Sequence, residues 1–162
     1  DYRNPPEQLN QIRRFIFTGF EKGCYQLAKF DSDTERKMAV ILERDPTVRL
    51  WMKPGPNQFK IFDIDGNPYQ PDFVVETDTE KFVIETKRAS DMTDPVVIRK
   101  ADAAALWTFL ATSTQASDGA EKPWSYLLVP EHAVIANATV KGLASSCTRI
   151  ADADLRTRYT HE

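Results

Sequence analysis

Apolar and polar residues alternate through the middle of the chain, and this alternation predicts a tight β-hairpin between Gln70 and Arg88. With the turn centred on Asp78 and Thr79, one side of the hairpin is wholly apolar, and we expect that side to be buried. A shift of the register by one residue would mix polar and apolar positions on both sides. The facing pairs expected on the apolar side are Val75 with Phe82 and Phe73 with Ile84.

The opposite side of this hairpin places two acids across from each other. Asp72 is expected to face Glu85, and Lys87 lies two residues further along on the same side. Facing carboxylates about 5 Å apart destabilise a pair of strands, and one of them would tend to take up a proton. A divalent cation bound by both acids removes this repulsion, and oxygen ligands favour a hard ion such as Mg²⁺. Beside such an ion, the Lys87 ammonium can orient a water for attack on a phosphodiester.

Helices and strands flank the hairpin in an order typical of a mixed sheet covered by helices. Ser32–Glu35 matches a capping box that opens a helix, which ends before Pro46. Pro95 suits the first turn of another helix. We expect, in chain order, a helix over 7–29, the capped helix, strands over 48–52 and 59–64, the hairpin, a helix from 95 to about 110, a polar loop over 112–123, a strand over 124–129, helical pieces around 134–143 and a polar tail.

Composition fits one compact domain, since the chain has 162 residues and 41% apolar content. We expect a linker over residues 1–6 and a single domain over 7–162. The first residue is Asp1 rather than Met, so we expect a fragment of a longer chain. No apolar run approaches the roughly 20 residues that cross a bilayer, and two distant cysteines favour reduced thiols, as in the cytoplasm. With a net charge of −3, any basic surface must be local.

The order Pro71-Asp72 and then Glu85-Thr86-Lys87 resembles the PD-(D/E)xK nuclease superfamily, which has the fold of restriction endonucleases. More narrowly, residues 30–129 resemble the endonuclease domain at the C-terminal end of the Res subunit of type III restriction enzymes. Arg88 departs from that pattern, because glycine is expected after the lysine. The segments that carry the resemblance are KFDSDTERKMAVILERD, VRLWMKP, YQPDFVV, FVIETKRASDMTDPVVIRKADAAALW and YLLVPE.

The resemblance implies an α/β restriction-endonuclease-like fold, a mixed β-sheet flanked by helices with an α-β-β-β-α-β core. It also implies cleavage of double-stranded DNA with Mg²⁺, for which Mn²⁺ can substitute. The implied partners are an upstream helicase or translocase domain and a methyltransferase subunit. ATP would be used only by that upstream motor, and no membrane is involved.

The same resemblance assigns roles to residues of the hairpin and its neighbours. The implied metal ligands are Asp72, Glu85 and the backbone carbonyl of Thr86, and Lys87 is implied to position or activate the water. A further acid is implied on the helix before the strands, and basic residues are expected to contact DNA near the site. The further acid is Glu35, and the basic residue that the resemblance implies is Lys100. DNA contacts are also expected from Arg88, because of its charge near the site, and from Gln70, which is next to the site by register.

Each assignment also has a purely structural alternative. The acidic pair could lie on a solvated sheet face, although facing carboxylates without a counter-ion are disfavoured. The capping box alone accounts for Glu35, and a lysine such as Lys100 is usually solvated. Two other functions stay open: a nuclease of the same superfamily from a repair or transposition system, and a module that binds DNA or a partner without cutting.

Overall fold

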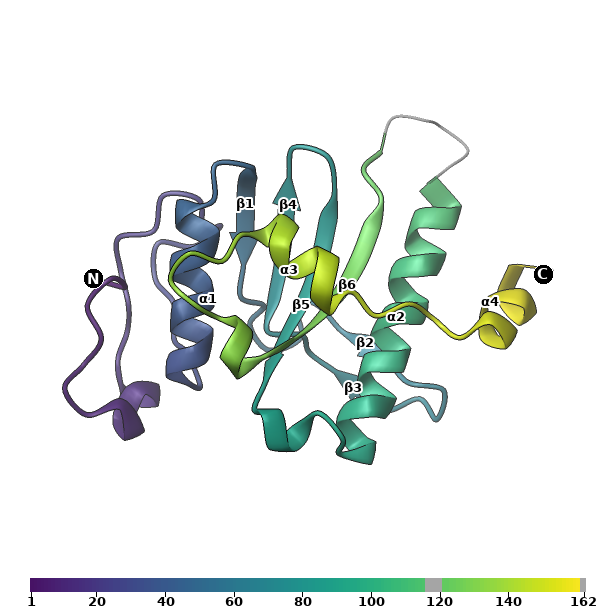
Figure 1. Cartoon of the computed structure of the whole chain (residues 1–162), viewed down its shortest axis with the longest axis horizontal. Helices are drawn as coiled ribbons and strands as arrows, with labels where there is room; N and C mark the ends of the chain where they lie inside the picture. Colours follow the sequence, from purple (N-terminus) through teal and green to yellow (C-terminus); the bar gives the residue numbers. More distant parts are fainter. Residues whose placement is uncertain (116–120, 161–162) are drawn as a thin grey trace.

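Four strands form one mixed sheet at the centre of the molecule, in the order β1-β4-β5-β6 (Figure 1). The computed structural model describes residues 1–115 and 121–160, so the expected polar loop over 112–123 falls partly outside the described residues. β1 and β5 pair antiparallel with β4, whereas β6 runs parallel to β5. The strands are β1 (Val48–Met52), β4 (Phe73–Thr77), β5 (Lys81–Lys87) and β6 (Trp124–Pro130).

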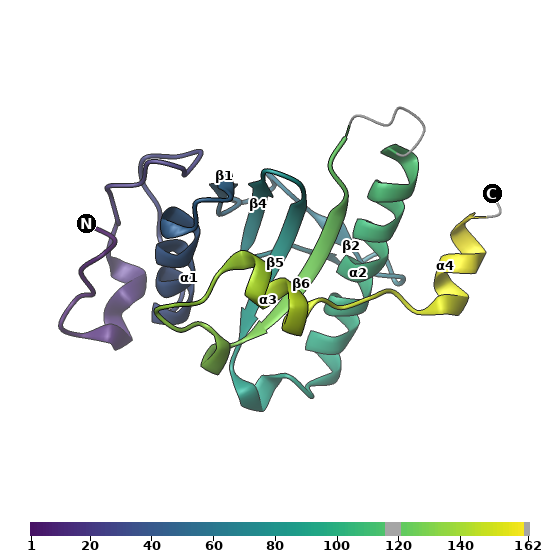
Figure 2. The ribbon, with the colours of Figure 1, turned by 45° about the horizontal axis from the view of Figure 1, so that its top comes forward.

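Helices cover both faces of the sheet (Figure 2). Residues of α1 and α3 share one hydrophobic core with the sheet, and residues of α2 share a second core with its other face. The order α1-β1-β4-β5-α2-β6 confirms the predicted α-β-β-β-α-β core of a restriction-endonuclease-like fold. The helical elements are η1 (Leu9–Arg14), α1 (Asp33–Arg44), η2 (Ala89–Asp91), α2 (Pro95–Gln115), η3 (Glu131–Ala133), α3 (Val140–Cys147) and α4 (Ala153–Thr160).

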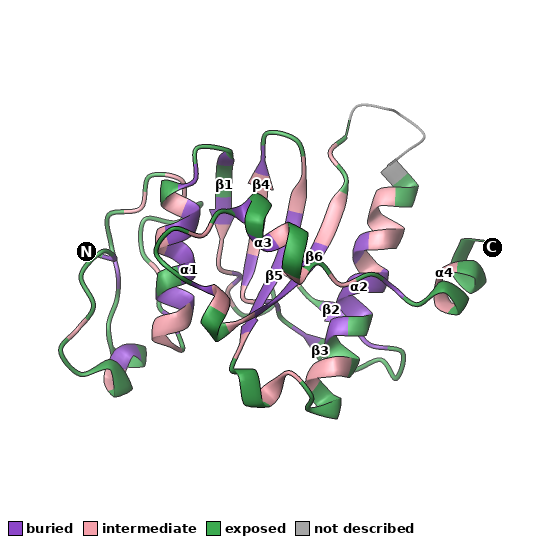
Figure 3. Ribbon diagram, in the orientation of Figure 1, coloured by how far each residue is buried: buried purple, intermediate pink, exposed green. Residues whose placement is uncertain are grey.

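Alternate residues of β5 enter the two cores, so this strand is buried on both faces (Figure 3). Phe82 and Ile84 belong to the core of α1 and α3, whereas Val83 belongs to the core of α2. Each of the three is at most 2% exposed, and full burial of such a side chain stabilises the fold by about 1.5–3 kcal/mol. Glu85, the next residue along β5, is therefore also buried in an apolar environment.

The hairpin has the register that the sequence predicts. On the apolar side, Val75 pairs with Phe82 and Phe73 pairs with Ile84. This last pair ends the regular ladder, so Asp72 lies one residue beyond it. The backbone at Asp72 is therefore not constrained by strand pairing, and its side chain can turn toward β5.

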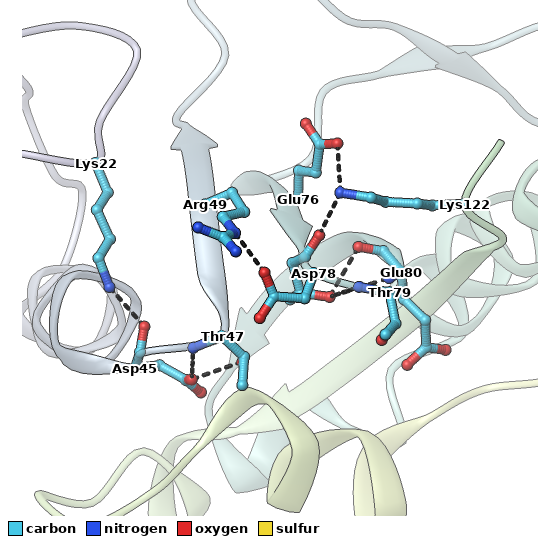
Figure 4. A network of polar contacts seen from close by, with 10 residues as sticks. Lys22, Asp45, Thr47, Arg49, Glu76, Asp78, Thr79, Glu80 and Lys122 are labelled. Carbon is cyan, nitrogen blue, oxygen red and sulfur yellow. Dashed lines mark hydrogen bonds and ion pairs between the residues drawn. The ribbon is translucent and has the colours of Figure 1, made fainter. Parts of the chain in front are cut away.

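Polar contacts hold the turn of the hairpin at the opposite end of β4 from Asp72 (Figure 4). The Lys122 ammonium donates to Glu76 Oε1 at 2.9 Å and to the Thr77 carbonyl at 2.7 Å. Asp78 forms an ion pair with Arg49 of β1. These contacts hold the pairing of β4 with β5 at the turn. The other end of the hairpin, where Asp72 lies, does not take part in them.

The predicted helix over residues 7–29 is wrong, because only the short η1 is helical there. The chain then runs extended, and Phe17 exchanges backbone hydrogen bonds with Ala28 at 2.8 and 3.1 Å. Gly19 adopts a positive φ of 92°, which a right-handed helix does not allow. Of the apolar residues whose spacing suggested a helix, Ile12 is buried in the core beside α1, whereas Phe15 and Ile16 are exposed.

Three smaller expectations also change. Tyr2 lies in the expected linker, yet it is buried in the same core. The expected strand over 59–64 shortens to β2 (Ile61–Phe62), which pairs with β3 (Pro68–Tyr69) in a separate two-stranded sheet. The expected polar tail contains α4. No helix in the described part of the chain is long and apolar enough to cross a membrane.

Candidate active site

The end of the hairpin brings Asp72 and Glu85 together, as the sequence predicts. The Asp72 backbone N–H donates to Glu85 Oε2 at 3.3 Å. Asp72 Oδ2 accepts two hydrogen bonds of 2.9 Å, from the backbone N–H and the hydroxyl of Thr86. Asp72 Oδ1 accepts no hydrogen bond from any described residue, and so one carboxylate oxygen is held in place while the other is left to bind a ligand.

Glu85 is a buried acid whose ionisation is disfavoured by its surroundings. Its residue is 7% exposed, and burial together with the nearby negative charge of Asp72 raises its pKa to about 7. The Lys87 ammonium lies 3.0 Å from Glu85 Oε1 and acts in the opposite direction. Glu85 therefore does not lie on a solvated sheet face, whereas Asp72 is half-buried and reaches the surface.

Glu35 serves as part of the helix cap and also reaches toward the acids. The Ser32 hydroxyl accepts from the Glu35 backbone N–H at 3.2 Å, which confirms the predicted N-cap of α1. The Glu35 carboxylate accepts from the Asp31 backbone N–H at 2.9 Å. Burial, and then the charge of Asp72, raise the pKa of Glu35. Glu35 therefore lies near enough to Asp72 for their charges to interact.

Lys53 is a member of this group that sequence reasoning missed. Its ammonium lies 2.8 Å from Glu35 Oε2, and its side chain is only 18% exposed. Burial lowers the pKa of Lys53, but the carboxylates of Glu35 and Asp72 outweigh that effect and raise it. Lys53 follows β1 directly, and the pairing of Met52 with Val74 brings it beside the start of β4. Only that strand pairing, not a local motif, could have identified it.

A polar cavity of about 900 Å³ opens onto this group. Both Glu35 and Asp72 line it, together with the strand end that carries Lys87 and Arg88. Two of the expected DNA contacts lie outside its lining. The Gln70 amide donates to the Pro54 carbonyl at 2.5 Å, and Lys100 is exposed on α2. The structure therefore brings Arg88 to the site, but not Gln70 or Lys100.

The oxygen donors fit a hard cation bound with few protein ligands. Within the described residues, no group of three or more His, Cys, Asp and Glu side chains has the arrangement of a metal site. Asp72 and Glu85 are two carboxylates, and burial, followed by the charge of Asp72, raises the pKa of Glu85. Mg²⁺ commonly binds through one or two carboxylates and completes its coordination with waters and substrate phosphates. The donor set is thus compatible with Mg²⁺.

Comparison with known proteins adds an independent finding. A family model described as an endonuclease domain matches residues 21–106, which is more than half of the 162-residue chain. The matched range contains Glu35, Lys53, Asp72, Glu85 and Lys87. No curated protein matches the chain. On the strength of the family match and the fold, the chain belongs to the endonuclease domain family.

Proposed function

We propose that this domain is a metal-dependent endonuclease that hydrolyses phosphodiester bonds of double-stranded DNA. One observation carries the proposal: the buried Glu85 lies against Asp72 and Lys87, and these two residues line a polar cavity. A buried acid whose pKa is raised by burial and by a second acid, next to a lysine that lines a cleft, is typical of a functional site. The family match supports an endonuclease, and the donor set supports Mg²⁺.

Each residue of the group has a role in this proposal. Asp72, Glu85 and the Thr86 carbonyl would hold Mg²⁺, with Mn²⁺ as a substitute, and the ion would supply positive charge to the scissile phosphate and lower the pKa of water. Lys87 orients the attacking water, since its ammonium is fixed by Glu85 at 3.0 Å. Glu35 contributes a further negative charge from α1.

The wider context that we propose is a type III restriction enzyme, with this chain as the cleavage domain of its Res subunit in the cytoplasm. The basis is the resemblance of residues 30–129, because the family match itself gives only an endonuclease. An ATP-driven motor domain and a methyltransferase subunit would then act with this domain. The positive charge for DNA binding would come from residues at the cavity such as Arg88.

DNA cleavage by the intact enzyme that contains this chain tests the proposal. Lys87→Met and Asp72→Asn should each abolish Mg²⁺-dependent cutting, since one removes the group that orients water and the other a metal ligand. Two matched controls are exposed residues outside the cavity, Lys141→Met and Asp65→Asn, which should cut like the wild type.

Normal cutting by Lys87→Met or Asp72→Asn would refute the proposed site. If instead the wild type binds DNA but never cuts it with Mg²⁺ or Mn²⁺, the domain is a binding module that does not cleave. Circular dichroism of each variant shows whether a loss of cutting comes from unfolding.

A further inference from the structure

A second cavity of about 400 Å³ lies next to the one that holds the acids. Lys53 lines this smaller cavity, whereas its ion-pair partner Glu35 lines the larger one. Asp31 lines both. The two cavities are therefore neighbours, and the Lys53–Glu35 pair stands between them.

Lys53 and Lys87 approach Asp72 from opposite sides. β4 is paired with β1 on one side and with β5 on the other, and Lys53 follows β1 while Lys87 ends β5. The Lys53 ammonium lies 5.8 Å from the centre of the Phe73 ring, one residue from Asp72. The acids are thus flanked by two cations that open into two different cavities.

Lys53 keeps the capacity to bind an anion while it stays paired with Glu35. An ammonium has three N–H donors, and the Lys53 ammonium pairs with only one described carboxylate, that of Glu35. Its side chain is 18% exposed, so part of it faces the smaller cavity. A phosphate oxygen in that cavity can accept a hydrogen bond from Lys53 without displacement of Glu35.

We propose that the smaller cavity is a phosphate subsite, in which Lys53 donates to a DNA phosphate next to the scissile one. This inference rests on the proposed DNA cleavage, since it places the neighbouring nucleotide of the same strand. Lys87 serves the attacking water at the acids, and Lys53 holds the adjoining phosphate. An exposed aromatic residue, Tyr25, also lines this cavity.

The test is designed to separate phosphate binding from the pairing with Glu35. Removal of Lys53 alone would leave a buried carboxylate without its partner, which destabilises a fold. The comparison is therefore made within the Glu35→Gln background, in which no carboxylate is left unpaired. Equilibrium DNA binding is measured in EDTA over a series of salt concentrations, so that no cleavage occurs.

Glu35→Gln/Lys53→Met should bind DNA more weakly than Glu35→Gln, and the slope of log K against log salt should fall by about one, as expected for the loss of one phosphate contact. Glu35→Gln/Lys53→Arg should restore the slope, because it keeps the charge. Glu35→Gln/Lys141→Met, which removes an exposed lysine of α3 outside both cavities, should leave the slope unchanged.

Equal slopes and affinities for Glu35→Gln and Glu35→Gln/Lys53→Met would overturn the subsite, even if the wild-type enzyme cuts DNA normally. Absence of DNA binding by the wild type in the same buffer would sink the proposed function together with the subsite. A lower slope for Glu35→Gln/Lys53→Met supports the subsite whether or not the isolated chain cuts DNA.

Discussion

At the scale of single residues, the site is a balance of charges buried at the edge of the sheet. Three carboxylates, from Glu35, Asp72 and Glu85, are faced by two ammoniums, from Lys53 and Lys87, which leaves one negative charge unmatched. Burial makes that charge costly and raises the pKa of Glu85 to about 7. The cation that we propose for this site would offset the unmatched charge.

This charge balance predicts how the stability of the metal-free protein depends on pH. The pKa of Glu85 rises from 4.5 to about 7 on folding, so the native state binds more protons than the unfolded state between these values. The free energy of unfolding should therefore fall as pH rises from about 4.5 through 7. Urea unfolding in EDTA at pH 5.5 and pH 8 measures this difference.

Glu85→Gln should flatten this pH dependence and stabilise the metal-free protein at pH 8. The pKa shift from 4.5 to about 7 sets an upper bound of about 3 kcal/mol on the gain. Glu7→Gln is the matched control, because Glu7 is exposed. Identical pH profiles for Glu85→Gln and the wild type would contradict the account.

At the same scale, the lining of the cavity predicts which basic side chains bind DNA. Arg88 lines the cavity and Lys100 does not, so Arg88→Gln should lower the salt slope of DNA binding by about one and Lys100→Gln should not. Binding measured over a salt series distinguishes them. A lower salt slope for Lys100→Gln, with an unchanged slope for Arg88→Gln, would place the DNA over α2 rather than over the cavity.

At the scale of elements, the sequence is most informative where the pattern is local. The hairpin register follows from period-two alternation, and the start of α1 follows from its cap; both are confirmed. The predicted helix over 7–29 is wrong because apolar spacing alone does not show which residues are buried: Ile12 enters the core, whereas Phe15 and Ile16, spaced on the same expected face, are exposed. Sequence reasoning missed Lys53 because its position beside the acids depends on the pairing of β1 with β4, which no local pattern predicts.

The cap of α1 gives a prediction that links an element to the site. Ser32→Ala removes the acceptor for the Glu35 backbone N–H and should cost about 1 kcal/mol of stability. Because Glu35 lies in that first turn, DNA cleavage by the folded fraction should also fall. Thermal unfolding and cleavage are measured on the same sample.

Thr139→Ala is the control, because Thr139 caps α3 through the Gly142 backbone N–H at 3.1 Å, away from the cavity. The Thr139→Ala variant should lose about as much stability as Ser32→Ala but should cleave DNA at the wild-type rate. If Ser32→Ala also keeps the wild-type rate, Glu35 does not need its helix cap to act.

At the scale of the whole molecule, polar contacts hold one end of the hairpin, and the acids of the proposed site lie at the other end. Polar contacts around Lys122 and Asp78 hold the hairpin turn, while two helical layers bury β5 on both faces. Glu85 is thus held in a buried strand, and Asp72, one residue beyond the ladder, lies beside it and lines the cavity. That arrangement is what a site needs in order to hold an ion and a phosphate in register.

The central claim is that Asp72 and Glu85 together bind a hard cation, and calorimetric titration of the 162-residue chain with Mn²⁺ tests it most directly. The wild type should bind the ion, whereas Asp72→Asn and Glu85→Gln should each weaken binding strongly and the exposed controls Asp65→Asn and Glu7→Gln should not. Equal Mn²⁺ binding by the wild type and Glu85→Gln would contradict the account.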